Sequence, residues 1–129
     1  MTKEPAKTFQ DLIVWQKAHQ FVLATYHFTA TFPDHEKDGL TALFRRSAVS
    51  IAANVAEAFT HKSKADKARY LGASQSAVEE CFYYLLLAKD LGYGQDEALT
   101  QQLTEVSKLL SDYTAIILTI KFLSSNFAR

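Results

Sequence analysis

The chain has 129 residues, 48% of them hydrophobic, and its 14 Lys and Arg residues balance its 14 Asp and Glu residues. This length is typical of one domain and allows a core without disulfide bonds or a structural metal. Zero net charge excludes a protein that attracts polyanions over its whole surface, so any nucleic-acid surface must be local. With only four Gly and two Pro, the composition favours a few long helices over many short strands.

Residues 1–8 contain a Pro and three charges, which predicts a flexible N-terminal arm rather than a signal peptide. No apolar run reaches the roughly 18 uninterrupted residues of a membrane span. The single cysteine, Cys81, has no partner for an internal disulfide bond, as is typical of a reducing compartment. We therefore expect a cytoplasmic protein that does not enter a membrane.

The first helix is expected at residues 9–30, where apolar residues recur every three or four positions. The segment TFPDHEKDG follows, and its clustered acids favour the start of a second helix at residues 38–59. Large apolar residues occupy one side of this helix and alanines fill much of the rest. Such small side chains allow neighbouring helices to approach closely on more than one side.

A third helix is expected at residues 63–91, with Ser63 as its N-cap and the glycine of GYG ending it. A fourth is expected at 96–124, starting at an Asp96 cap and following the heptad seam Leu99, Leu103, Val106, Leu110, Tyr113, Ile117 and Ile120. A second apolar line widens that seam: Leu109, Ile116 and Leu123. Short connections make successive helices antiparallel, so the predicted fold is all-α, an up-down-up-down four-helix bundle over residues 9–124.

A polar stripe crosses the small, apolar second helix. At ~100° per residue, its members lie within roughly 80° of one another; they are Arg46, Ser50, Asn54 and Glu57. Ser and Asn are mediocre helix formers, so an ordinary solvated face would favour other residues. The stripe indicates side chains that are held by something specific.

The third helix carries the same two charges in the opposite order, as Arg69 and Glu80. Partners in an antiparallel hairpin share a constant sum of residue numbers, and Arg46 with Glu80 and Glu57 with Arg69 both give 126. Half of this sum is Ser63, the expected cap at the turn. We therefore predict both ion pairs within the hairpin, and we assign them to register or partner choice because ion pairs are weak evidence for net stability.

Four stretches, FQDLIVWQKA, FPDHE, RRSAVSIAANVAEA and YYLLLAKDLGY, resemble the four helix bundle protein family, also called the 23S rRNA intervening-sequence protein family. The resemblance runs from about Phe9 to about Lys121. It implies a cytosolic bacterial protein that assembles into a ring, expected to be a homopentamer. It also places the family's polar and small residues on Arg46, Ser50, Asn54, Ala56, Glu57 and Glu80. The chain departs from the family's usual Gln, Pro and Gly at Leu43, Ala52 and Ala58.

No set of residues indicates catalysis or metal binding. Di-iron bundles use Glu-x-x-His pairs, and the chain contains none. His61 follows Glu57 by four residues at an expected helix end, where a solvated His is favoured over a metal ligand, and His19 and His27 are expected in packing contacts. Cys81 lies in an apolar run and is expected to be an inert buried thiol. We therefore expect no catalytic residue, metal or cofactor, and a protein that is not an enzyme.

Two functions remain open. The first is a non-enzymatic assembly protein that forms a homo-oligomeric ring, as a scaffold associated with RNA or ribonucleoprotein, because its apolar helix faces exceed what one small bundle hides. The alternative is a nucleic-acid-binding accessory module that uses the basic segment HKSKADKAR. This segment contains only one acidic residue beside His61, Lys62, Lys64, Lys67 and Arg69. A solvated turn is the plainer interpretation of that segment. The expected partners are copies of the chain and, in the alternative, RNA or another nucleic acid.

Overall fold

The computed structural model describes residues 5–127, with side chains as far as residue 119. It contains two short 3-10 turns, η1 (Phe9–Asp11) and η2 (Asp34–Glu36), and four long helices: α1 (Ile13–Thr29), α2 (Leu40–Thr60), α3 (Lys64–Asp90) and α4 (Glu97–Phe127). Residues 5–127 include no strand, which confirms the all-α prediction.

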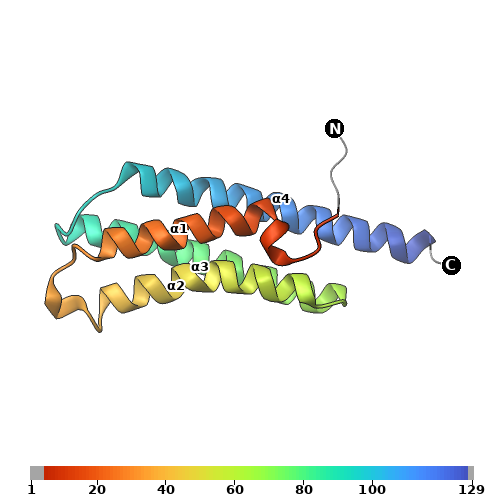
Figure 1. Ribbon diagram of the computed structural model, residues 1–129, viewed down its shortest axis with the longest axis horizontal. Helices are drawn as coiled ribbons and strands as arrows, with labels where there is room; N and C mark the ends of the chain where they lie inside the picture. Colours follow the sequence, from red (N-terminus) through yellow and green to blue (C-terminus); the bar gives the residue numbers. More distant parts are fainter. Residues whose placement is uncertain (1–4, 128–129) are drawn as a thin grey trace.

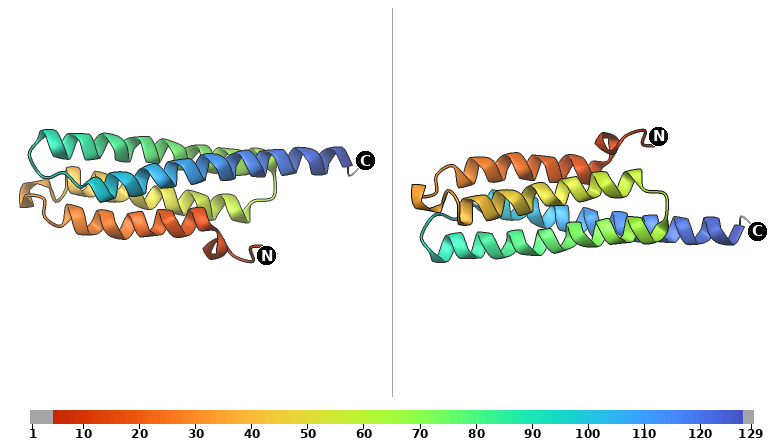
Figure 2. Two further views of the ribbon diagram at one scale, coloured as in Figure 1. Left: turned by 90° about the horizontal axis from the view of Figure 1, so that it is seen from above. Right: turned by 90° about the horizontal axis from the view of Figure 1, so that it is seen from below.

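The four helices lie side by side, and successive helices run in opposite directions (Figures 1 and 2). Each helix packs on two neighbours, in the order α1, α2, α3, α4 and back to α1. The pair α2 and α3 therefore forms one side of the bundle, and the pair α1 and α4 forms the opposite side. α4 continues well past the ends of the other three helices (Figure 2).

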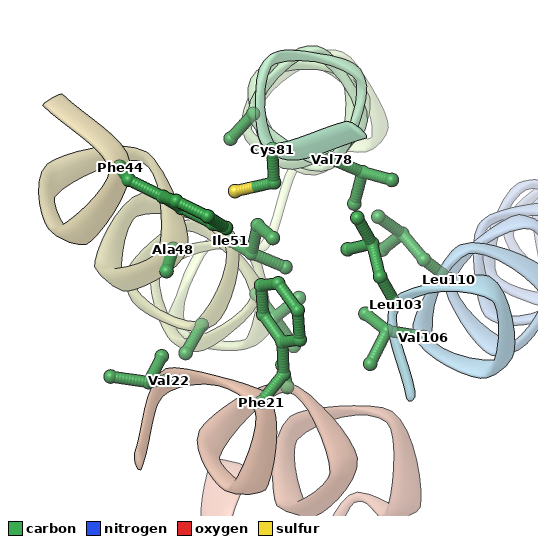
Figure 3. Packing of buried hydrophobic residues seen from close by; sticks show 14 of the residues in the cluster. Phe21, Val22, Phe44, Ala48, Ile51, Val78, Cys81, Leu103, Val106 and Leu110 are labelled. Atoms are coloured by element: carbon green, nitrogen blue, oxygen red, sulfur yellow. The ribbon is translucent and has the colours of Figure 1, made fainter. Parts of the chain in front are cut away.

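One hydrophobic core fills the space between the helices. Figure 3 shows side chains from all four helices pointing into it. Phe21 of α1, Phe44 and Ile51 of α2, Cys81 of α3 and Leu103 of α4 are each 0% exposed. The core explains why helices of modest intrinsic stability form, because most helical stability in proteins comes from packing of the apolar face.

The predicted seam of α4 is confirmed over its first four positions, which are at most 1% exposed: Leu99, Leu103, Val106 and Leu110. On the second apolar line, Ile116 is 54% exposed. The side chains of Ile120 and Leu123 lie outside the described residues. α4 packs on both α1 and α3. Although α4 has 31 residues, neither it nor any other helix within residues 5–127 is both long and apolar enough to cross a membrane.

The start of the first helix differs from the prediction because residues 9–11 form the separate turn η1. The Thr8 side chain accepts a hydrogen bond from the Gln10 N–H, and the Asp11 carboxylate accepts from the N–H groups of Thr8 and Lys7. The two bonds to the Asp11 carboxylate, that from the Thr8 N–H first and then that from the Lys7 N–H, hold the pKa of Asp11 below its usual value. Residue 12 is extended, so α1 begins only after it. Residues 1–4 of the predicted arm lie outside the described residues.

The predicted caps of α3 and α4 are present. The Ser63 side chain accepts a hydrogen bond from the Asp66 N–H at 3.0 Å, and the Asp96 carboxylate accepts from the Leu99 N–H at 3.0 Å. α3 ends at Asp90, one residue before the predicted end, and the predicted glycine follows at Gly92, whose φ of 78° lies in the left-handed region that favours glycine.

Candidate functional site

The contact between α2 and α3 is close enough for side chains of one helix to reach the backbone of the other. Ser74 of α3 donates a hydrogen bond of 2.8 Å to the carbonyl oxygen of Ile51 in α2. One turn away, the Ser47 hydroxyl donates to a carboxylate oxygen of Glu80 at 3.2 Å. Both pairs have residue numbers that add to within one of 126, so the antiparallel register deduced from the sequence is confirmed to within one residue.

The two ion pairs predicted within this hairpin are wrong. Glu57 lies 3.3 Å from His61 instead of pairing with Arg69. Arg69 lies 3.3 Å from Asp66, one turn earlier on its own helix. Both charges therefore pair locally, at the end of the bundle where α2 turns into α3.

Arg46 also fails to reach Glu80, although the two residues lie at the same height, that is, at the same position along the long axis of the bundle. Arg46 precedes Ser47 by one residue, which is a rotation of ~100° around the helix. Ser47 therefore faces α3 and takes the Glu80 carboxylate, while Arg46 points outward and is exposed. Among the side chains described, Arg46 forms no ion pair within 4.0 Å.

The middle of the polar stripe on α2 is held by a local bond. The Asn54 amide donates to the Ser50 hydroxyl and to the Ser50 carbonyl oxygen, both at 2.9 Å. Both side chains are half-buried. Beside them, Leu43 and Val49 are 43% and 41% exposed, so the stripe lies on a partly apolar outer surface.

Two rows of residues define this outer surface. The outer stripe of α2 is Leu43, Arg46, Ser50, Ala53 and Glu57, and the outer stripe of α3 is Arg69, Ala73, Ser76, Glu80 and Tyr83. Every member is exposed except the half-buried Ser50. Within each stripe the residues alternate in steps of three and four, which keeps them on one face of a helix. The two stripes present opposite orders of charge side by side.

Several charged side chains of the basic segment 61–69 bind groups of the same chain. Lys67 donates to the carbonyl oxygens of Ala58 at 2.9 Å and Phe59 at 3.3 Å, and thereby caps the C-terminus of α2. His61 lies between the Glu57 and Asp66 carboxylates. The side chains of Lys62 and Lys64 are exposed on the turn.

The positions of the remaining candidate groups suit packing rather than chemistry. Cys81 is fully buried, and burial, together with the neighbouring Glu80 charge, raises the pKa of its thiol to about 12. The His19 ring stacks on Trp15 with 4.9 Å between ring centroids. Within the described residues, no cluster of three His, Cys, Asp or Glu side chains is placed to hold a metal ion.

A polar cluster that the sequence did not predict joins the two loops at the other end of the bundle. The Tyr93 hydroxyl donates to the Glu36 carboxylate at 2.7 Å, and that carboxylate also accepts from the Leu40 N–H at 3.0 Å. The Leu40 bond first, and then the Tyr93 bond, lower the pKa of Glu36, while the bond to Glu36 raises the pKa of Tyr93. The acids of FPDHE were expected to favour the start of α2. No pattern in the neighbouring sequence predicted that Tyr93 would bind one of them.

Arg45 is a second residue that the sequence analysis passed over in favour of its neighbour Arg46. Its Nε donates to the Thr29 hydroxyl at 2.8 Å, and its guanidinium lies 4.5 Å from the centre of the Tyr26 ring. Arg45 thus ties α2 to the last turn of α1. The pattern of polar residues along α2 does not predict this bridging role, because the partners of Arg45 lie on α1.

Comparison with known proteins agrees with this fold. Residues 10–112 match the family model described as 23S rRNA-intervening sequence protein. A crystal structure of a protein of unknown function from the S23 ribosomal protein family of Bacteroides thetaiotaomicron is 25% identical, with a TM-score of 0.73 over 80% of this chain and 96% of that chain. A search of proteins with curated functions found no match. Because the family model covers most of the sequence, the chain belongs to the 23S rRNA-intervening sequence protein family, as its motifs indicated.

Proposed function

We propose that this protein is a non-enzymatic building block that assembles with copies of itself into a homo-oligomeric ring in the cytoplasm. The family resemblance sets a homopentamer as the working stoichiometry. Among the side chains of residues 5–119, nine large apolar ones are each more than 40% exposed, and we take this exposure as support for self-assembly: Ile13, Leu23, Tyr26, Leu43, Val49, Tyr83, Leu86, Leu91 and Ile116. Exposed apolar side chains mark a site of protein contact where they adjoin one another, as Ile13 and Ile116 do in the groove described below.

The observation that carries this proposal is the far end of α4. The helix continues past the rest of the bundle (Figure 1), and no other helix of residues 5–127 lies beside this extension. At the base of this extension lies an open, mainly apolar groove of about 180 Å³. It is lined by Leu12, Ile13 and Val14 near the start of α1 and by Leu109, Asp112, Tyr113 and Ile116 of α4. An apolar groove at the base of this helix extension is suited to contact with another copy.

Light scattering coupled to gel filtration tests this proposal. The expected mass is about five times the 14.5 kDa of one chain, and Ile116→Glu is expected to lower it because the new charge lies at the groove. The matched control is Gln101→Glu, which adds the same charge at an exposed position of α4. A mass of one chain at every protein concentration overturns the proposal.

The same ring is proposed to serve as a scaffold associated with RNA or ribonucleoprotein. The support is the name of the family to which the chain belongs, which refers to 23S rRNA. Protein purified without nuclease is expected to carry RNA, seen as excess absorbance at 260 nm that ribonuclease removes. Protein free of nucleic acid under gentle, low-salt purification contradicts this part of the proposal.

A second candidate function is a nucleic-acid-binding accessory module, favoured by the exposure of Lys62 and Lys64 on the turn between α2 and α3. In a ring whose axis runs along the helices, these turns form one rim, and phosphate contacts by such a rim weaken as salt rises. Anisotropy with labelled structured and single-stranded RNA at low and moderate salt tests this. A double change of Lys62→Glu and Lys64→Glu is expected to abolish binding, whereas Lys89→Glu at the other end of α3 is not. Absence of binding at low salt excludes the candidate.

A further inference from the structure

We propose that the outer stripe of α2 on one copy packs antiparallel against the outer stripe of α3 on a second copy. In this contact Arg46 pairs with Glu80 of the second copy, and Glu57 pairs with Arg69 of the second copy. The inference rests on the proposed self-assembly and names one contact between copies, which is separate from the groove between α1 and α4.

Geometry supplies the first argument. A rotation about an axis parallel to the helices carries a residue around the assembly without changing its height. The bonds from Ser47 to Glu80 and from Ser74 to Ile51 fix which residues of α2 and α3 share a height within one chain. Any cyclic assembly about such an axis, whatever its copy number, keeps those heights equal between copies. The sum of 126 then applies between copies as it does within the hairpin.

Chemical complementarity supplies the second argument. At this register five pairs of residues, here called rungs, face each other across the two stripes, and the two side chains of each rung are compatible. The two charged rungs bring opposite signs together, Arg46 to Glu80 and Glu57 to Arg69. The remaining rungs pair Leu43 with Tyr83, Ser50 with Ser76 and Ala53 with Ala73. Leu43 and Tyr83 are 43% and 56% exposed in the single chain, so their contact removes apolar surface from water.

The shape of the two stripes agrees with a helix-to-helix contact. Steps of three and four along each stripe are the spacing of a coiled-coil seam. The central rungs consist of small side chains, which allow helix axes to approach within about 8 Å. Next to Ala73, a side chain at Gly72 would meet nothing within 4 Å, so the surface there is open to an incoming helix.

A contact between two copies of the α2 stripe is the competing arrangement, because Arg46 could then face Glu57 of the second copy. That register sets Leu43 against Thr60 and leaves Tyr83 of α3 uncovered. The α2-to-α3 contact covers both exposed apolar side chains and uses both outer stripes. Variants in which charges on α2 and α3 are reversed, singly and together, distinguish the two arrangements.

The test measures mass by light scattering for single and double charge reversals. Arg46→Glu is expected to lower the mass of the assembly, because it sets two negative groups against each other. Adding Glu80→Arg to that variant is expected to restore the wild-type mass, whereas adding Glu57→Arg is not. Glu57→Arg and Arg69→Glu form a second, independent pair with the same expected loss and rescue.

The control is Glu97→Arg, an exposed reversal in the first turn of α4, away from both outer stripes and from the groove, which is expected to keep the wild-type mass. Circular dichroism checks that each variant keeps its helices. An oligomeric wild type whose mass survives both single reversals overturns this interface and leaves self-assembly standing. Rescue by Glu57→Arg in place of Glu80→Arg also overturns it, in favour of an α2-to-α2 contact. A monomeric wild type overturns both proposals.

Discussion

The Ser74 hydroxyl of α3 donates a 2.8 Å hydrogen bond to the backbone carbonyl oxygen of Ile51 in α2. Both residues are 0% exposed. A bond from a short side chain to the backbone of another helix forms only where the two helices are very close. Ser74 therefore sets the spacing of the α2 and α3 hairpin, which carries both outer stripes.

Replacing Ser74 by Leu is expected to destabilise the protein by about 1–3 kcal/mol, because the added carbons force α2 and α3 apart. Ser74→Ala, which only removes the hydrogen bond, is expected to cost about 1 kcal/mol. Urea denaturation at one fixed protein concentration measures both values. Gln75→Leu adds a similar side chain at an exposed neighbouring position and is expected to change stability by less than about 0.5 kcal/mol. Equal losses at the two positions would show that Ser74 does not set the spacing.

The Cys81 thiol is expected to resist thiol reagents at pH 8 in the folded protein and to react fully in denaturant. Its pKa of about 12 leaves almost no thiolate at that pH, and the side chain is 0% exposed. Absorbance after addition of an aromatic disulfide reagent measures the reaction. One equivalent of rapid labelling in native buffer contradicts a buried thiol.

The same thiol contributes to alkaline unfolding. Its folded pKa of about 12 lies above the ordinary value of 9.0, so its contribution to stability is complete below pH 9.0 and is lost as pH rises towards 12. Cys81→Ala is therefore expected to lose stability less steeply than the wild type over this range. Tyr93 and Tyr113, whose pKa values are also raised, titrate in both proteins and leave this difference unaffected. Identical slopes for the two proteins contradict this assignment.

Glu36 is expected to make the protein less stable in acid. Its pKa is lowered by the Leu40 N–H and then by the Tyr93 hydroxyl, so its contribution is present above the ordinary value of 4.5 and is lost as pH falls below it. Melting temperatures of the wild type and Glu36→Gln are therefore expected to differ at neutral pH and to converge in acid. Asp34→Asn, an exposed change in the same turn, is the control. A constant gap between wild type and Glu36→Gln at all pH values would rule out the charged interaction.

Local signals predicted most of the fold. The spacing of Leu99, Leu103, Val106 and Leu110 identified the buried face of α4, and the cap at Ser63 was placed correctly, because both depend on neighbours in the sequence. The first helix was extended too far because the hydrogen bonds around Thr8 and Asp11 end η1 before α1 starts. Periodicity alone does not detect such an interruption.

The candidate site was predicted only in part, and the error has a simple geometric cause. The order of charges on the two helices correctly predicted that Arg46 and Glu80 lie at the same position along the bundle axis. It did not predict the direction in which each side chain points from its helix. Ser47, one residue later, faces α3 and takes the carboxylate instead. The bond between Tyr93 and Glu36 joins residues 57 positions apart, and no local pattern marks such a contact.

Cross-linking between two single-cysteine variants tests most directly whether a second copy covers the outer stripe of α2. Ala53→Cys and Ala73→Cys are made separately in a Cys81→Ala background, so that each protein has one thiol on one stripe. The two proteins are mixed under conditions that allow copies to exchange and are treated with a short thiol-specific cross-linker. A covalent dimer in the mixture, absent from either protein alone, is the predicted result. A mixture that remains oligomeric by mass but yields no covalent dimer would contradict the contact between the two stripes.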